Sequence, residues 1–287
     1  MVTRHDMIKD VHESSGMPFS VLMSVYYKEN PAFLDESLNS VFSQSLPPDD
    51  VVLVKDGPLT DGLEAVIEKY KTRYSVLNVI PLTVNSGLGK ALNEGLKYCK
   101  FDIVARMDSD DICKPDRFRK QISFMRNHPG IDACSAWIDE FQINTDNIIS
   151  TKKLPETSTE IYSYGKKRCP INHPVVVFRR RAVLNAGGYM HYPLFEDYYL
   201  WARMLVAGAE FHNLQESLLW FRTNPAMYKR RGGWKYAVTE IRLQFLFVGI
   251  GYIGFGTFIK NVFVRFLVRI MPNNVRSFFY KYFLRRK

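Results

Sequence analysis

The sequence has little of what marks secreted or disulfide-stabilised proteins. It contains only four cysteines, and no two of them have CxxC spacing. So few thiols without pairing favour reduced, mostly buried cysteines in a cytosolic compartment over a disulfide framework or a zinc site. Residues 1–16 are polar and mixed in charge, without the apolar core of a signal peptide. We therefore expect residues 1–17 to form a disordered extension.

Acidic residues are absent after Glu240. Nine lysines and arginines follow this position and account for most of the net charge of +10. They are interleaved with aromatic and aliphatic residues, which predicts amphipathic helices over residues 236–287 on an anionic membrane surface. A protein that binds nucleic acid would instead spread its basic residues over a folded face. The alternative is an ordinary helical pack against the preceding domain.

Long hydrophobic runs are absent as well. The uncharged stretch at residues 245–259 is shorter than the ~20 residues that a membrane-spanning helix needs. The sequence therefore predicts a peripheral membrane protein, and it leaves open whether this stretch inserts into the membrane or lies on it.

The sequence does contain a regular alternation of strand and helix patterns, with 46% hydrophobic and 14% aromatic residues to fill a core. Such alternation predicts an α/β fold, a mainly parallel sheet flanked by helices. The expected strands are 19–27, 51–57, 76–82 and 101–107, and the expected helices are 31–45, 63–74 and 87–98. Later strands are expected at 132–141, 147–154 and 175–181, the first two antiparallel, before a helix from Phe195.

The predicted strand at 101–107 ends in three carboxylates, Asp108, Asp110 and Asp111. Mg²⁺ and Mn²⁺ prefer oxygen ligands, and Mg²⁺ commonly takes one or two carboxylates together with substrate phosphates. A polar turn that caps the following helix is the alternative. Three acids within four positions repel one another, which favours a bound cation.

Polar residues also follow the other predicted parallel strands, namely Ser24, Tyr26, Asp56 and Asn85. The carboxyl ends of parallel strands share one rim of a sheet, where ligands of such folds bind. Their joint occurrence on this rim is a stronger signal than any one of them.

The helix expected at 87–98 begins with a second pattern, Asn85, Gly87 and Lys90. Gly87 lets a ligand approach the backbone closely, a helix N-terminus attracts phosphate, and Lys90 adds a positive charge. The alternative is a helix cap by Asn85 or Ser86 with a solvated lysine.

Six stretches, taken in order, resemble a known family. They are FSVLMSVYYKEN, VLVKDGP, NSGLGKALNEGL, ARMDSDDICKPDRF, NHPVVVFRR with AGGY, and FEDYYLWARML. Over residues 18–235 the chain resembles family 2 glycosyltransferases with a GT-A fold, and more narrowly the bacterial O-antigen and amylovoran-type exopolysaccharide enzymes.

This resemblance implies an inverting, metal-dependent transfer with Mg²⁺ or Mn²⁺. The donor would be UDP-galactose, UDP-glucose or an N-acetyl form, and the acceptor an undecaprenyl-diphosphate-linked saccharide. The enzyme would work at the cytoplasmic face of the bacterial inner membrane.

On the donor side the resemblance gives roles to the rim residues. They are Asp56 at the nucleotide base, Ser24, Tyr26 and Glu29 along the base and ribose, Asn85 and Lys90 near the phosphates, Asp108 at the ribose or metal, and Asp110 at the metal. Asp111 would act through water or cap the helix that begins near Pro115.

On the acceptor side the resemblance makes Asp197 the base that deprotonates the acceptor hydroxyl, with Glu196 orienting it. A helix N-terminal acid pair favoured by the macrodipole is the alternative. His173 and Trp201 would contact the acceptor, although structural and core roles are open for both.

The basic segment 228–233 would close over the diphosphate as a lid through Arg230 or Arg231. A solvated basic loop is an equally weighted alternative.

Two other functions compete with sugar transfer. A sugar-1-phosphate nucleotidyltransferase also puts acids on a nucleotide-binding sheet, but usually has a glycine-rich loop after its first strand, where this chain reads SVYYKEN. A non-catalytic, basic membrane-binding module would leave Asp56, Asp108, Asp110 and Asp197 unexplained.

Overall fold

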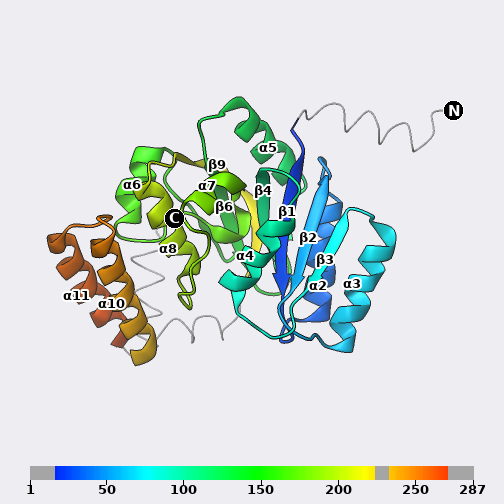
Figure 1. Cartoon of the computed structure of the whole chain (residues 1–287), viewed down its shortest axis with the longest axis horizontal. Helices are drawn as coiled ribbons and strands as arrows, with labels where there is room; N and C mark the ends of the chain where they lie inside the picture. Colours follow the sequence, from blue (N-terminus) through cyan, green and yellow to red (C-terminus); the bar gives the residue numbers. More distant parts are fainter. Residues whose placement is uncertain (1–16, 224–232, 271–287) are drawn as a thin grey trace.

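One nine-stranded sheet organises the residues that the computed structural model describes, 17–223 and 233–270 (Figure 1). The strand order is β3-β2-β1-β4-β8-β6-β9-β5, and β7 pairs with β6 outside this path. Helices cover both faces of the sheet, and the last two helices lie at one end of the molecule (Figure 1).

The first four strands are parallel, as the sequence predicts. Their bounds are β1 Phe19–Val25, β2 Asp50–Lys55, β3 Leu77–Pro81 and β4 Ile103–Asp108, and the helices between them are α2 Pro31–Phe42, α3 Asp61–Arg73 and α4 Leu88–Tyr98. The start of α2 shows how local sequence fixes an element. Asn30 Oδ1 accepts a hydrogen bond from the amide of Ala32 at 2.9 Å, and Pro31 occupies the first turn, where its missing N–H costs nothing.

The second half of the sheet is mixed. Its strands are β5 Ile112–Cys113, β6 Ala133–Phe141, β7 Ser150–Lys152, β8 Val177–Arg179 and β9 Phe211–Arg222. β6 and β7 are antiparallel, as expected, whereas β9 is parallel to β6 and is not among the expected strands. The helices of this half are α5 Arg117–Asn127, α6 Ser158–Gly165, α7 Arg180–Asn185 and α8 Glu196–Val206.

The strand expected over residues 175–181 is shorter than predicted. A 3-10 turn occupies His173–Val175, β8 spans only three residues, and α7 begins at Arg180. Pro174 lies within that turn, and its fixed φ and missing N–H suit a turn better than a central strand.

Two hydrophobic clusters fill the faces of the sheet. One lies beneath α4, α8 and α10 and includes Leu92, Leu200 and Phe247. The other lies beneath α2, α3 and α5. The two clusters pack against opposite faces of the sheet and fix the strands, so the polar residues at the strand ends are attached to a well-packed core.

The chain ends in two helices, α10 Trp234–Gly249 and α11 Phe255–Ile270. The uncharged stretch 245–259 is divided between them by a turn in which Gly251 has φ +74°. Among residues 17–223 and 233–270, no helix combines the length and apolar character that crossing a bilayer requires. α10 belongs partly to the core, because Phe247 packs against Tyr198 of α8 with ring centres 4.9 Å apart.

Candidate active site

The three acids meet at the carboxyl end of β4. Asp108 is the last residue of the strand, opposite Ser24 of β1, and Asp110 and Asp111 follow in the turn before β5. One carboxylate oxygen from each acid lies within 4.8 Å of the other two. Asp108 and Asp110 are half-buried, whereas Asp111 is fully buried. This is the convergence that the sequence pattern predicts.

The electrostatics of this turn are unfavourable without a positive partner. Burial raises the pKa of Asp110 to about 7, with further contributions from the charges of Asp108 and Glu29. Burial and the neighbouring carboxylates also raise the pKa of Asp111 well above its usual range. Glu29 joins the turn directly, because Ser109 Oγ donates to its Oε2 at 2.7 Å. Closely packed carboxylates of this kind are stabilised by a cation.

The donor set fits a hard divalent cation. It consists of carboxylate oxygens, and Asp111 Oδ2 is buried without a hydrogen-bond partner among the described residues. A buried, unpaired carboxylate oxygen is costly unless a ligand satisfies it. Oxygen ligands suit Mg²⁺ and Mn²⁺ better than softer metals.

Arg222, at the end of β9, holds the acid turn in place. Its amide donates to Asp111 Oδ1 and its Nε to the carbonyl oxygen of Asp110, both at 2.8 Å. The guanidinium also pairs with Glu36 and lies 4.0 Å from the ring centre of Phe33. Sequence reasoning misses this residue, because the run FHNLQESLLWFR lacks the regular alternation that would identify β9.

Asp56 organises the loop before α4. Its Oδ1 accepts the amide of Ser86 at 2.6 Å and its Oδ2 the amide of Gly87 at 3.0 Å, while Asn85 Nδ2 donates to the carbonyl oxygen of Asp56 at 3.1 Å. Asp56 is 3% exposed. Each of its oxygens therefore has one main-chain partner and one lone pair left for a ligand.

A glycine is required next to Asp56. Gly57 has φ +87°, and a methyl group in place of its hydrogen would lie 2.7 Å from the amide nitrogen of Asn85. Only glycine adopts this backbone at no cost and lets the two segments approach so closely.

The other donor-side candidates lie around this loop. Ser24 and Tyr26 are half-buried at the end of β1, whereas Asn85 and Lys90 are exposed on either side of the α4 N-terminus. Their side chains are thus near the rim, within the region where the strand ends and the helix N-terminus converge.

Glu196 and Asp197 open α8, and Glu196 lies against the first turn of α4. A methyl group at Gly89 would lie 3.1 Å from Cγ of Glu196. Burial raises the pKa of Glu196 to about 7, and the charge of Asp197 adds to the effect. Cys169 Sγ lies 3.8 Å from Asp197 Oδ2. The acid pair of α8 and the phosphate-binding candidates of α4 therefore share one neighbourhood.

The structure corrects the expectation for Trp201. Its indole is fully buried and packs edge-on to Phe211 and His173, with ring centres 5.9 and 6.0 Å apart. It has no exposed face on which a sugar could stack, so the core alternative holds. In α8 it follows buried Tyr198 and Tyr199 by three and two residues, in the part of the helix that packs into the core and not at the rim.

His173 lies beneath the rim. It is 9% exposed, and its Nε2 lies 2.9 Å from the hydroxyl of Tyr189. Burial, and then the charge of Arg106, lower the pKa of His173 well below its usual range, so the imidazole is neutral. Direct contact with an acceptor would require the layer above it to open.

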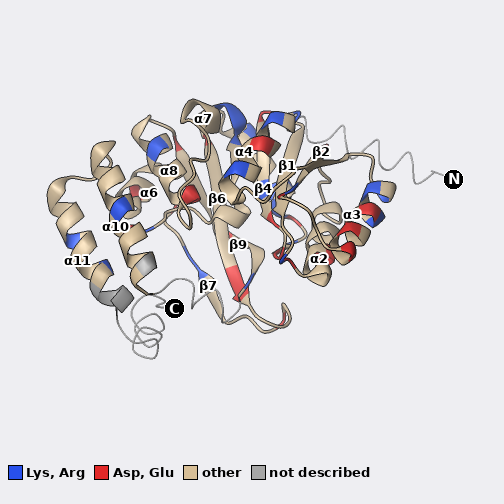
Figure 2. Cartoon of the chain, turned by 60° about the horizontal axis from the view of Figure 1, so that its bottom comes forward, with Lys and Arg blue, Asp and Glu red and all other residues tan. Residues whose placement is uncertain are grey.

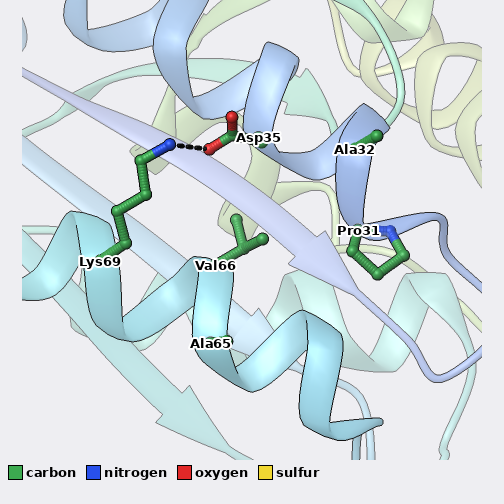
Figure 3. A pocket seen from close by; sticks show the side chains of 6 residues that line it. All are labelled: Pro31, Ala32, Asp35, Ala65, Val66 and Lys69. Atoms are coloured by element: carbon green, nitrogen blue, oxygen red, sulfur yellow. Dashed lines mark hydrogen bonds and ion pairs between the residues drawn. The ribbon is translucent and has the colours of Figure 1, made fainter.

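The remaining features are the lid candidates and one pocket. The lid candidates Arg230 and Arg231 fall outside the described residues. A shallow pocket between α2 and α3 is lined by Pro31, Ala32, Asp35, Ala65, Val66 and Lys69 (Figure 3). It contains none of the candidate acids, and the Lys69–Asp35 ion pair spans it.

Comparison with known proteins identifies what this arrangement belongs to. The chain is 40% identical over 268 residues to the UDP-Gal:alpha-D-GlcNAc-diphosphoundecaprenol beta-1,3-galactosyltransferase of Escherichia coli, covering 93% of this chain and 97% of the relative. It is 39% identical over 263 residues to the amylovoran biosynthesis glycosyltransferase AmsE of Erwinia amylovora, covering 92% and 98%.

A solved structure shows the same fold at low identity. The mannosyltransferase PcManGT from Pyrobaculum calidifontis, in complex with GDP-Man and Mn²⁺, superposes with a TM-score of 0.61 at 16% identity, covering 90% of this chain and 71% of that one. The likeness supports the expected GT-A architecture.

Residues 20–188, which contain the acid turn and the Asp56 loop, match the profile of glycosyl transferase family 2. This match sets aside the nucleotidyltransferase and the non-catalytic membrane module. The chain belongs to glycosyl transferase family 2 and is a glycosyltransferase with the GT-A fold.

Proposed function

We propose that the protein transfers a hexose, with inversion, from a UDP-sugar to a lipid-linked saccharide during assembly of a bacterial surface polysaccharide. The observation that carries this proposal is the convergence of three carboxylates at the carboxyl end of β4. A second acid pair opens α8, where Glu196 contacts Gly89 of α4. Burial raises the pKa of Tyr189, and the charges of Asp197 and Asp108 both add to this rise, so the two acidic groups lie within electrostatic range of one side chain. The name of the E. coli relative makes UDP-galactose the first donor to test.

On the donor side, Asp56 accepts a hydrogen bond from the nucleotide base with Ser24, Tyr26 and Glu29 beside it. The two amides that already bind Asp56 fix the direction of its carboxylate. The N-terminus of α4 and Lys90 bind the diphosphate, since helix N-termini and lysines attract phosphate. Arg230 and Arg231 complete this contact as a lid.

Asp110 would hold the divalent cation, and of the two roles expected for Asp108, ribose or cation, we assign it the ribose of the donor. The unpaired Oδ2 of Asp111 makes this acid, expected only to act through water or as a helix cap, a second candidate ligand. A bound Mg²⁺ or Mn²⁺ would neutralise charge on the departing nucleoside diphosphate. The named Mn²⁺ complex of PcManGT makes Mn²⁺ the first ion to test. The mutual repulsion and the unpaired oxygen of the acid turn support this assignment.

On the acceptor side, Asp197 takes the proton from the attacking hydroxyl, and Glu196 hydrogen-bonds the acceptor. An inverting transfer requires a carboxylate on the face opposite the leaving group, within hydrogen-bond reach of the nucleophile. Since the pKa of Glu196 is about 7, this side chain can donate a hydrogen bond at neutral pH while its neighbour accepts one.

A direct test is to incubate the full chain with Mn²⁺, each of a panel of UDP-sugars, and a synthetic GlcNAc-diphosphate lipid. We expect one sugar to be transferred, and we expect neither Asp110→Asn nor Asp197→Asn to transfer it. Asp35→Asn is the matched control, because Asp35 is an acid outside the site, paired with Lys69. Transfer by the Asp197 variant at the wild-type rate would contradict the assigned base.

The acceptor's lipid anchor suits a membrane-seated protein, with residues 18–235 as the catalytic domain and 236–287 as the extension. The distribution of side chains on α11 supports this, because a polar residue faces the protein and several apolar residues face outward. Asn261 faces inward and donates to Gln244 Oε1 at 2.8 Å, whereas Phe255, Ile259 and Phe263 are 69%, 53% and 65% exposed.

Spacing by four residues puts these three side chains on one stripe of the helix. Figure 2 shows basic but no acidic residues along α11, and α11 forms the outer end of the molecule in Figure 1. Among the described side chains, Lys260 is exposed next to this stripe, whereas Arg265 pairs with Glu240 of α10. An apolar outer stripe with an exposed lysine beside it matches the boundary of an anionic bilayer. We assign this face to the cytoplasmic leaflet of the bacterial inner membrane.

Flotation with vesicles tests the membrane assignment. Vesicles rich in anionic lipid should carry the wild-type chain, and replacing Phe255 and Phe263 by serine should reduce the floated fraction several-fold. Replacing exposed Ile143 of the β6–β7 connection by serine is the control. If the double variant floats as well as wild type, the exposed face of α11 does not bind the membrane. If wild type is a dimer and the double variant is a monomer, the face binds a second copy of the chain.

A further inference from the structure

Arg106 and Arg117 are both buried, with 1% and 0% of their surface exposed, but their surroundings differ. Arg117 donates to neutral acceptors through all three nitrogens, for example to Gln121 Oε1 at 3.1 Å and the carbonyl oxygen of Arg106 at 2.6 Å. Arg106 donates from Nη2 to Asp108. Its Nε and Nη1 have no hydrogen-bond partner within the described residues. Because burying unpaired guanidinium donors is costly, packing alone does not explain Arg106.

Arg106 lies directly behind the donor rim. Side chains alternate along a strand, so Val104, Arg106 and Asp108 of β4 point to the same face of the sheet. Val104 belongs to the cluster beneath α4 and α8. Arg106 stands opposite Leu22 of β1, two pairs before Asp108 and Ser24. The guanidinium is therefore under the acid turn, on the side where α4 and α8 meet.

The charge of Arg106 reaches both halves of the site. Burial, followed by this charge, lowers the pKa of His173. Burial raises the pKa of Tyr189, and Arg106 opposes that rise. Asp197 and Asp108 both add to the rise, so the phenol lies in the electrostatic range of a donor-side and an acceptor-side acid. Arg106 and Tyr189 thus occupy the layer between them.

This layer is fixed to α4. The amide of Tyr189 donates to Asn93 Oδ1 at 2.8 Å, and Asn93 Nδ2 donates to the carbonyl oxygen of Tyr189 at 2.6 Å. A methyl group at Gly188, where φ is +65°, would lie 2.6 Å from Asn93 Oδ1. Tyr189 is therefore tied to α4 below the acid turn. There Arg106 donates a hydrogen bond to one carboxylate, Asp108. Its charge also opposes the rise in the pKa of Asp110 and of Asp111.

We propose that Arg106 is a positioning residue that reserves Asp108 for the nucleotide. By pairing with Oδ1, it fixes the carboxylate and leaves Oδ2 to accept a hydrogen bond from the ribose, while Asp110 and Asp111 are left for the cation. The inference rests on the proposed function, in which Asp108 contacts the donor. It predicts that removing Arg106 weakens nucleotide affinity and does not weaken metal affinity.

The test measures two binding constants of the full chain separately. Mn²⁺ binding without nucleotide is followed by electron paramagnetic resonance, and UDP binding at saturating Mn²⁺ by calorimetry. In Arg106→Met we expect Mn²⁺ affinity within about threefold of wild type or tighter. We expect UDP affinity to fall about tenfold or more, because hydrogen bonds supported by a charge are worth more than neutral ones.

A double-mutant cycle shows whether Arg106 acts through Asp108. If it does, Arg106→Met should add little to the loss of UDP affinity in Asp108→Asn. Arg106→Lys, which keeps the charge without the planar fork, should recover part of the affinity. UDP losses that add in the double variant, or UDP affinity within twofold of wild type in Arg106→Met, would overturn the proposal.

Arg117→Met is the matched control for the loss of a buried arginine. It should lower the thermal midpoint and leave both binding constants of the folded protein unchanged. If Arg106→Met lowered both affinities in equal proportion, its role would be structural and the proposal wrong. A wild-type chain that binds Mn²⁺ but no UDP would contradict the proposed function itself, whereas normal UDP binding by Arg106→Met would contradict only this inference.

Discussion

The two acidic groups of the site are built in opposite ways. The donor-side acids are crowded at one strand end and fixed by main-chain amides and arginines, as when the amide of Arg222 donates to Asp111 Oδ1. The acceptor-side pair, Glu196 and Asp197, opens a helix, where the dipole favours negative charge. Its contacts are a thiol and the flank of α4.

This difference matches two kinds of chemistry. A cation site gains from carboxylates that repel one another, since the cation relieves the repulsion. A proton-transfer site gains from two carboxyl groups with different environments, so that one can stay charged while the other holds a proton. Both sides of the site contact α4. Asp56 accepts a hydrogen bond from the amide of Gly87 at its N-terminus, and Glu196 contacts Gly89 in its first turn.

The largest expected effect is a loss of transfer that separates the roles of the donor-side and acceptor-side acids. Asp110→Asn and Asp197→Asn should each lower the transfer rate at least about 10²–10⁴-fold, because each removes a group that acts in the transition state. Only Asp110→Asn should weaken UDP binding in the presence of Mn²⁺. Transfer assays and calorimetry on the same preparations measure both quantities.

Equal losses of UDP affinity in Asp110→Asn and Asp197→Asn would contradict the separation into a donor side and an acceptor side. In that case, Asp197 would support the donor and the proton would be taken elsewhere. Thermal unfolding of each variant serves as the control, because both side chains lie at the rim and neither variant should unfold before wild type by more than a few degrees.

A smaller effect is expected at the loop that joins Asp56 to α4. Gly57→Ala forces an L-residue to φ +87° with its Cβ 2.7 Å from a backbone nitrogen. We expect a loss of about 2–4 kcal/mol in the free energy of unfolding, measured by denaturant titration, together with weaker UDP binding.

Gly130→Ala is the matched control, since no atom lies within 4 Å of the added methyl group. It should change the unfolding free energy by less than about 1 kcal/mol. If Gly57→Ala were equally neutral, the loop would be able to move away, and the fixed direction of the Asp56 carboxylate would lose its support.

The parallel half of the fold and the acid turn were predictable because their signals are local. A strand such as FDIVARM shows continuous apolar character, and its carboxyl end identifies the rim at once. Asn30 and Pro31 likewise identify the start of α2.

The second half was harder because its pairings are distant in sequence. Arg222 contacts acids more than a hundred residues earlier, and no local pattern reveals this. The sequence places Trp201 at the acceptor because it follows Asp197 by four residues on one stripe of a helix. That spacing is one helical turn, and α8 is already buried in the core one turn beyond Asp197. In the sequence Arg106 belongs to the apolar strand pattern FDIVARM, and only its pairing with Asp108 in the structure distinguishes it.

The smallest expected effect concerns Glu196 and its dependence on pH. Its folded-state pKa of about 7 lies above the ordinary value of 4.5, so between these values the folded protein holds a proton that the unfolded chain has lost. Stability must therefore fall as the pH rises through this range.

Glu196→Gln removes that dependence. We expect the variant to gain about 1–2 kcal/mol of stability relative to wild type between pH 5 and pH 8, after allowance for solvent screening. Thermal unfolding at several pH values measures this. Glu68→Gln on α3, where the side chain of Glu68 is 70% exposed, is the control, and its difference in stability from wild type should not change with pH.

Glu196→Gln also tests which of the two acids accepts the proton of the acceptor. If Asp197 takes the proton, Glu196→Gln retains transfer to within about tenfold, whereas loss as severe as that of Asp197→Asn would make the pair, and not one acid, the base.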